Sequence, residues 1–140
     1  MPIMFPSDEW IVAYKSQIDE KPDYKEGGKN WRAGPIVLVI NEKPQIGLEK
    51  DFNIYLDLHE GQCREARQCT PEEASGQPFV IRGDYDRWKL VIREQLEPVK
   101  GMMQGKLRLT GDLPTIVRSI DAAKALVRCA TFVETAFVDE

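Results

Sequence analysis

The chain has 140 residues, of which 42% are hydrophobic and 30% are charged, and its net charge is −4. A chain of this length buries about 70% of its unfolded surface, so we expect one domain over residues 1–140 that folds without disulfides or a metal ion. The acidic balance argues against nucleic-acid binding, because phosphate contacts need a concentrated basic surface. No apolar run approaches the roughly 20 residues that cross a bilayer.

The three cysteines cannot all pair within one chain. Cys63 and Cys69 fall in one predicted strand, where a rise of about 3.3 Å per residue separates them by about 20 Å. That separation is far beyond the roughly 5.5 Å between the Cα atoms of a disulfide. Cys129 falls in a predicted helix. We therefore expect reduced thiols and a cytoplasmic protein, and the N-terminus lacks the basic start of a secretory signal.

The first part of the chain predicts two helices followed by a buried strand. Ser7 is a typical N-cap, and apolar residues then repeat at helical spacing from Trp10 to Ile18. Pro22 interrupts this pattern, and a second short helix follows it. Residues 36–40 are apolar on both faces, which is typical of a central strand that is covered on both sides.

The middle of the chain predicts a hairpin and a third strand. Residues 52–59 alternate between apolar and polar side chains, and a Glu-Gly turn joins them to a more polar strand over residues 62–70. Residues 71–76 resemble a short helix or a loop. Residues 77–82 return as a strand.

The second half is dominated by apolar helices. Asp84 is the expected cap of a helix whose apolar stripe runs from Trp88 to Leu96. Residues 98–105 predict a short helical turn, and residues 106–110 predict a last strand. A single helix of about five turns should follow. Its apolar face consists of Leu113, Ile116, Val117, Ile120, Ala123, Val127 and Ala130.

This order of elements predicts an α+β fold with a mostly antiparallel sheet and helices packed on it, because strands and helices do not alternate regularly.

Few residues are candidates for catalysis or metal binding. His59 shares a strand face with Asp57, but no further metal ligand lies at a recognisable spacing. Asp84 and Asp86 lie at the start of a predicted helix, where capping and a favourable contact with the helix dipole explain them better than a pair of catalytic carboxylates does. We expect no catalytic residue, no metal, no cofactor and no enzyme activity.

One stretch carries a family resemblance. Residues 98–113 read PVKGMMQGKLRLTGDL. They resemble the signature of the sterol carrier protein type-two domain, in which a short helix with a methionine–glycine pair leads into a Gly-Lys-Leu-x-Leu-x-Gly-Asp strand and turn. Residues 113–130, 133–137 and 10–31 continue the likeness, which covers most of the chain.

The resemblance implies a twisted, roughly five-stranded sheet with helices on one face. It also implies an apolar tunnel between sheet and helices, for a sterol, fatty acid, fatty acyl-CoA or similar lipid that is carried or sequestered. Combined with helix and strand phase, it predicts ten residues of the tunnel wall: Trp88, Val91, Ile92, Met102, Met103, Leu107, Leu109, Ile116, Val117 and Ile120.

Two alternatives to a lone lipid-binding domain stay open. The chain could shelter the substrate of a separate enzyme, or its apolar face could be closed by a partner subunit such as a second copy. A basic cluster of Lys100, Lys106 and Arg108, with Arg118 further on, is interpreted as solvated surface. The alternative interpretation is that this basic cluster makes transient contact with anionic membrane lipids.

Overall fold

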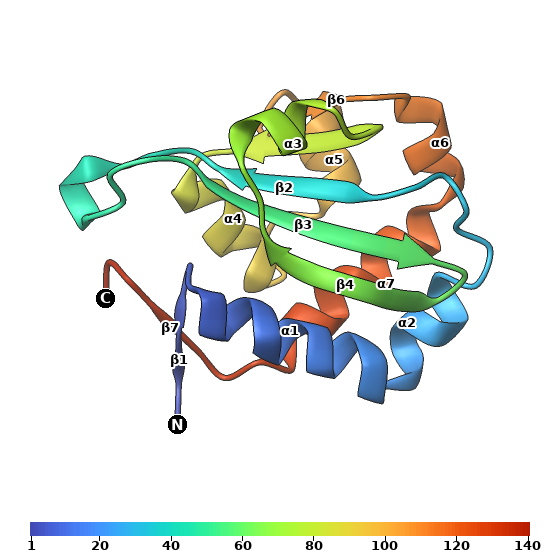
Figure 1. Cartoon of the computed structure of the whole chain (residues 1–140), viewed down its shortest axis with the longest axis horizontal. Coiled ribbons are helices and arrows are strands. Elements are labelled where there is room, and N and C mark those ends of the chain that lie inside the picture. The colour runs from blue at the N-terminus through green and yellow to red at the C-terminus, as the bar shows by residue number, and fades with distance from the viewer.

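The computed structural model describes all 140 residues and places a five-stranded sheet at the centre of the molecule (Figure 1). The strand order is β4-β3-β2-β5-β6. The central β2 (Ile36–Ile40) pairs antiparallel with β3 (Phe52–His59) and parallel with β5 (Phe79–Gly83). The outer strands β4 (Gln62–Gln68) and β6 (Arg108–Thr110) are antiparallel to their neighbours. The predicted α+β class and mostly antiparallel five-stranded sheet are confirmed.

The register places the apolar side chains of the central strands on one face of the sheet. Ile36 and Leu38 of β2 lie opposite Leu56 and Ile54 of β3. Ile81 of β5 lies on the other side of Leu38. These side chains form one face because successive residues of a strand point to opposite sides. They belong to the main hydrophobic core of the molecule.

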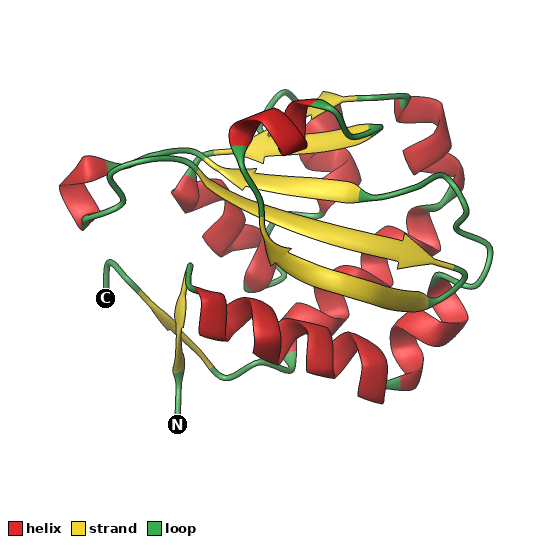
Figure 2. Ribbon diagram, in the orientation of Figure 1, coloured by secondary structure: helices red, strands yellow, loops and turns green.

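Most helices pack on this apolar face (Figure 2). They are α1 (Asp8–Glu20), α2 (Pro22–Gly27), α4 (Tyr85–Ile92), α5 (Pro98–Met103), α6 (Leu113–Arg118) and α7 (Ile120–Thr131). Only the short α3 (Pro71–Ser75) covers the opposite face, where Ala74 packs with Val37 and Val39. Figure 1 shows α3 in front of the sheet and α4, α5 and α7 behind it.

The expected single helix over residues 113–130 is wrong. Two helices, α6 and α7, meet at Ser119, whose backbone leaves the helical region with φ −110° and ψ 34°. The Ser119 amide closes a tighter turn on the Ile116 carbonyl. Three β-branched residues precede the break, and serine competes for backbone hydrogen bonds, so the local preference for helix is weak.

Two other features differ from the sequence expectation. The helix α4 ends at Ile92, so Leu96 lies beyond it although it is buried in the core. A second, two-stranded parallel sheet joins the chain ends through β1 (Ile3–Phe5) and β7 (Thr135–Phe137). Strands of three residues are too short to show a period in the sequence. A short 3-10 helix, η1 (Pro44–Ile46), completes the elements.

All three cysteines are free, with Cys63 and Cys129 buried and Cys69 partly exposed. None of the helices combines the length and the apolar character needed to span a membrane.

Candidate functional site

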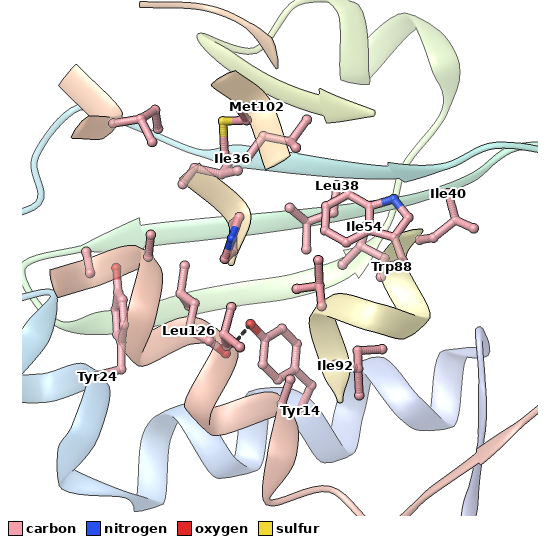
Figure 3. A pocket seen from close by; sticks show the side chains of 18 of the residues that line it. Tyr14, Tyr24, Ile36, Leu38, Ile40, Ile54, Trp88, Ile92, Met102 and Leu126 are labelled. Carbon is pink, nitrogen blue, oxygen red and sulfur yellow. Dashed lines mark hydrogen bonds between the residues drawn. The ribbon is translucent and has the colours of Figure 1, made fainter. Parts of the chain in front are cut away.

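An apolar cavity of about 90 Å³ lies between the sheet and the helices (Figure 3). Twenty of its 22 lining residues are hydrophobic. The sheet provides one wall, with Ile36, Leu38 and Ile40 of β2, Ile54 of β3 and Ile81 of β5. The helix α7 provides the facing wall. Its lining residues are Ala122, Ala123, Leu126, Val127 and Ala130.

The N-terminal part of the chain contributes an aromatic wall that sequence reasoning missed. It consists of Phe5, Trp10, Tyr14, Tyr24 and Trp31. The rings contact one another, with 4.8 Å between the ring centroids of Phe5 and Trp10 and 4.9 Å between those of Trp10 and Tyr14. The signal in the sequence was the aromatic stripe of the first helix, which is equally typical of an ordinary core. With Trp88, all three tryptophans of the chain line the cavity.

Most polar groups of the aromatic side chains are paired by hydrogen bonds within the protein. This pairing leaves the faces of the rings as apolar wall. Four donors each make a bond of 2.9 Å: Trp10 Nε1 to Thr135 Oγ1, Tyr14 Oη to the Leu126 carbonyl, Trp31 Nε1 to the Gly34 carbonyl, and Trp88 Nε1 to the Val39 carbonyl. Figure 3 shows the bond from Tyr14 to Leu126.

The wall of the cavity carries no charge. No charged side chain lines it. Burial raises the pKa of Tyr14 well above its ordinary value, and burial also raises the pKa of Tyr24. Both phenols therefore stay protonated and uncharged at neutral pH. Such a site can hold an apolar molecule, and its lining contains no His, Cys, Asp, Glu, Lys or Arg side chain.

Half of the predicted wall residues line this cavity. Trp88, Val91 and Ile92 line it from α4, Met102 from α5 and Ile116 from α6. All five are buried or partly buried.

The other five predicted residues do not line the cavity. Met103 and Val117 are 69% and 43% exposed, because each follows a lining residue and points away from it. Leu107 is buried in the core beside Gly83 and Gly101. Leu109 and Ile120 pack against the edge of the core.

The residues considered for chemistry lie outside the cavity in polar pairs. His59 Nε2 lies 2.9 Å from Glu60 Oε1, and Asp57 pairs with Arg64. Asp84 accepts a hydrogen bond from Asn41, and Asp86 pairs with Lys43. No three His, Cys, Asp or Glu side chains are arranged to hold a metal ion.

The comparisons with known proteins agree with this geometry. The model of the SCP-2 sterol transfer family matches residues 13–122. A crystal structure of sterol carrier protein 2 is 30% identical, with a TM-score of 0.82, covering 91% of this chain and 97% of its own. The solution structure of a conserved hypothetical protein from Thermus thermophilus is also 30% identical, with a TM-score of 0.82, covering 93% of this chain and 90% of its own.

A more distant structure shares the fold. Sterol carrier protein 2 of Aedes aegypti, solved in complex with palmitate, is 13% identical with a TM-score of 0.52, covering 84% of this chain and 94% of its own. No curated protein matches this chain in sequence.

Proposed function

The chain belongs to the SCP-2 sterol transfer family, and from this premise we propose that it binds one lipid molecule in the cavity between sheet and helices, for carriage or sequestration. Binding or transfer of lipids is the general function of this family. The observation that carries the proposal is the lining, with 20 hydrophobic residues out of 22 and no charged side chain. The palmitate bound by the Aedes aegypti relative supports a lipid with a long hydrocarbon chain.

The size of the cavity sets a condition on this proposal. Its volume of about 90 Å³ is smaller than the roughly 150 Å³ of an engineered cavity that binds benzene. A long hydrocarbon chain must therefore displace side chains and enlarge the space. Met102 is well placed to move, because it is unbranched, polarizable and partly exposed.

The energetics allow binding of useful strength despite this enlargement. Each buried CH₂ contributes about 0.8 kcal/mol, so a chain of fourteen carbons gains about 11 kcal/mol. The loss of rigid-body freedom and the rearrangement of the wall offset several kcal/mol of that gain. The remainder corresponds to a dissociation constant of about 1 μM. A protein with this affinity binds its lipid and can still release it.

The route into the cavity is part of the proposal. Five of the seven partly exposed lining residues lie on α5 and α7: Pro98 and Met102 on the first helix, and Ala123, Leu126 and Val127 on the second. We place the mouth of the cavity between these two helices. The exposed Met103 lies next to Met102 at this mouth.

A membrane surface is the partner that the charge around the mouth favours. Residues 98–131 carry six basic and two acidic side chains, whereas the rest of the chain carries thirteen basic and twenty-one acidic ones. None of the six cations forms an ion pair within the protein. Arg108 lines a polar pocket on the α3 face of the sheet, and the other five lie outside that pocket. Unpaired cations beside exposed apolar side chains suit an anionic bilayer surface. We therefore propose transient contact of the mouth with a membrane.

The alternative function, an interaction module whose apolar face is closed by a partner subunit, is less well supported than lipid binding. It requires the space between sheet and helices to be filled by the chain's own side chains. The cavity supports a site for a small molecule instead.

The three tryptophans make the proposal directly testable. A brominated lipid such as bromododecanol, whose bromine quenches indole emission on contact, should quench the chain's fluorescence in a saturable way, because Trp10, Trp31 and Trp88 all line the cavity. Ala123→Phe places a ring in the cavity without burying a charge, and we expect it to weaken binding by at least about tenfold. Lys124→Phe is the matched control, because its side chain is exposed. Equal quenching of both variants, folded by circular dichroism, would contradict the proposal.

A further inference from the structure

Two hydroxyl groups of the cavity wall have no hydrogen-bond partner in the protein. The lining contains six side chains with nitrogen or oxygen, and four of them are paired as described above. The other two are Tyr24 and Ser119, whose hydroxyls take part in no hydrogen bond of the structure. Ser119 is the N-cap of α7, yet its side chain makes no capping bond.

An unpaired hydroxyl is unusual at a position as buried as Tyr24. The side chain has 0% exposure, and buried polar groups in folded proteins nearly always have a partner. The one fully buried side-chain oxygen or nitrogen without a partner is Gln17 Oε1, so the Tyr24 hydroxyl is not a sealed, unsatisfied group. An oxygen that faces the cavity can instead be paired by a ligand.

The packing of α2 on α7 places the two hydroxyls at the same end of the cavity. A Cβ atom on Gly28 would lie 2.4 Å from Tyr24 Cζ, the carbon that carries the hydroxyl, so this end of the ring lies under Gly28. The neighbouring Gly27 abuts the carbonyl of Asp121 in the first turn of α7. Ser119 directly precedes that turn. Figure 3 shows the Tyr24 side chain beside α7 with its hydroxyl toward the cavity.

We propose that Tyr24 and Ser119 form a polar pole that binds the neutral oxygen of an amphiphilic lipid, such as the hydroxyl of a long-chain alcohol or of a sterol. This inference rests on the proposed function, because it assigns the orientation and head-group chemistry of a lipid in that cavity. Both hydroxyls can donate and accept, so together they match a hydroxyl that does the same.

A neutral head group is favoured over an ionised one. No cation lines the cavity, and an ionised carboxylate without a positive partner is strongly disfavoured in an apolar site. Burial raises the pKa of Tyr24, so its phenol remains a neutral donor. The rest of the lipid lies along the apolar walls formed by β2, α4 and α7.

The test compares dodecanol with dodecane, which differ only in the hydroxyl, by titration of tryptophan emission. In Tyr24→Phe we expect the dissociation constant for dodecanol to rise about tenfold and that for dodecane to stay unchanged. Ser119→Ala should act in the same direction. Tyr55→Phe is the matched control, since Tyr55 packs with Val37 and Val39 on the opposite face of the sheet and does not line the cavity.

The outcomes separate this inference from the proposed function. If neither compound changes the emission of the wild-type protein, the proposed function fails. If both bind, and Tyr24→Phe binds dodecanol as tightly as the wild type does, only the polar pole fails. Tighter binding of ionised dodecanoate than of dodecanol would overturn the neutral head group.

Discussion

Two tyrosines of the cavity wall differ in the state of their hydroxyl. Tyr14 and Tyr24 are both buried, but only Tyr14 donates a hydrogen bond, of 2.9 Å, to Leu126. Removal of a buried hydroxyl that donates a hydrogen bond loses the stabilisation of that bond. We therefore expect Tyr14→Phe to lower the free energy of unfolding by about 1 kcal/mol, as measured by urea denaturation.

Tyr24→Phe should behave in the opposite way in the absence of lipid. It removes a buried hydroxyl that lacks a partner, so we expect stability to be unchanged or slightly higher. A loss as large as that of Tyr14→Phe would show that the Tyr24 hydroxyl is paired within the protein.

Buried thiols make the fold sensitive to alkaline pH. Burial raises the pKa of Cys63 from 9.0 to about 12 and that of Cys129 to about 11. A thiol with a higher pKa in the folded state holds its proton more tightly there, so its contribution to stability is complete below the unfolded pKa. That contribution is lost as the pH rises toward the folded pKa.

We therefore expect the thermal unfolding midpoint to fall steadily above about pH 9, the ordinary range of thiol ionisation. Raised pKa values of Tyr14, Tyr24 and Tyr85 act in the same direction. Calorimetry at a series of pH values measures this dependence. A midpoint that stays constant from neutral pH to about pH 11 would contradict it.

At the scale of elements, the four strands of five or more residues were predictable from their side-chain pattern. Residues 36–40 are apolar on both faces, and the structure buries Val37 and Val39 under α3 while Ile36 and Ile40 face the cavity. The alternation over residues 52–59 likewise matched β3. A period of two assigns each residue to a face without knowledge of the rest of the fold.

The helices around the cavity were less predictable, because a helical period gives a face only while the helix is unbroken. The break at Ser119 ends the apolar stripe that the sequence predicts through Val117 and Ile120. Half of the predicted wall residues nevertheless line the cavity. The aromatic wall from Phe5 to Trp31 lies far away in sequence, so only the tertiary packing of α1 and α2 shows its position.

The contact between α2 and α7 closes one side of the cavity and depends on Gly27. A Cβ atom there would lie 2.8 Å from both the Ala125 Cβ and the Asp121 carbonyl oxygen. We expect Gly27→Ala to force the helices apart and to lower the free energy of unfolding by about 1–3 kcal/mol in urea denaturation. Gly76→Ala is the control, because its nearest neighbours lie at 3.6 Å, and it should be neutral or slightly stabilising. Equal stability of the two variants would contradict this account of the contact.

At the scale of the whole molecule, charge is divided between the mouth and the remaining surface. Residues 98–131 carry a surplus of basic side chains on a chain whose net charge is −4. Each lysine near an anionic bilayer contributes about 1 kcal/mol to binding. We expect the double variant Lys100→Glu, Lys106→Glu to bind vesicles rich in phosphatidylserine at least about tenfold more weakly in co-sedimentation.

The control for this prediction changes the net charge equally at a distance from the mouth. Lys25 and Lys50 are also exposed and unpaired, so Lys25→Glu, Lys50→Glu should bind the same vesicles almost as well as the wild type. If the two double variants lose vesicle binding to the same extent, net charge rather than the mouth governs the contact.

The central claim is that the space between sheet and helices admits one lipid molecule. Native mass spectrometry, after incubation of the purified chain with extracted cellular lipids and removal of the excess, tests this claim most directly. We expect a single bound lipid per chain in the wild type and in Lys124→Phe, and its loss in Ala123→Phe, which fills the cavity. A wild-type chain that carries no lipid, or an Ala123→Phe chain that carries as much as the wild type, would contradict the account.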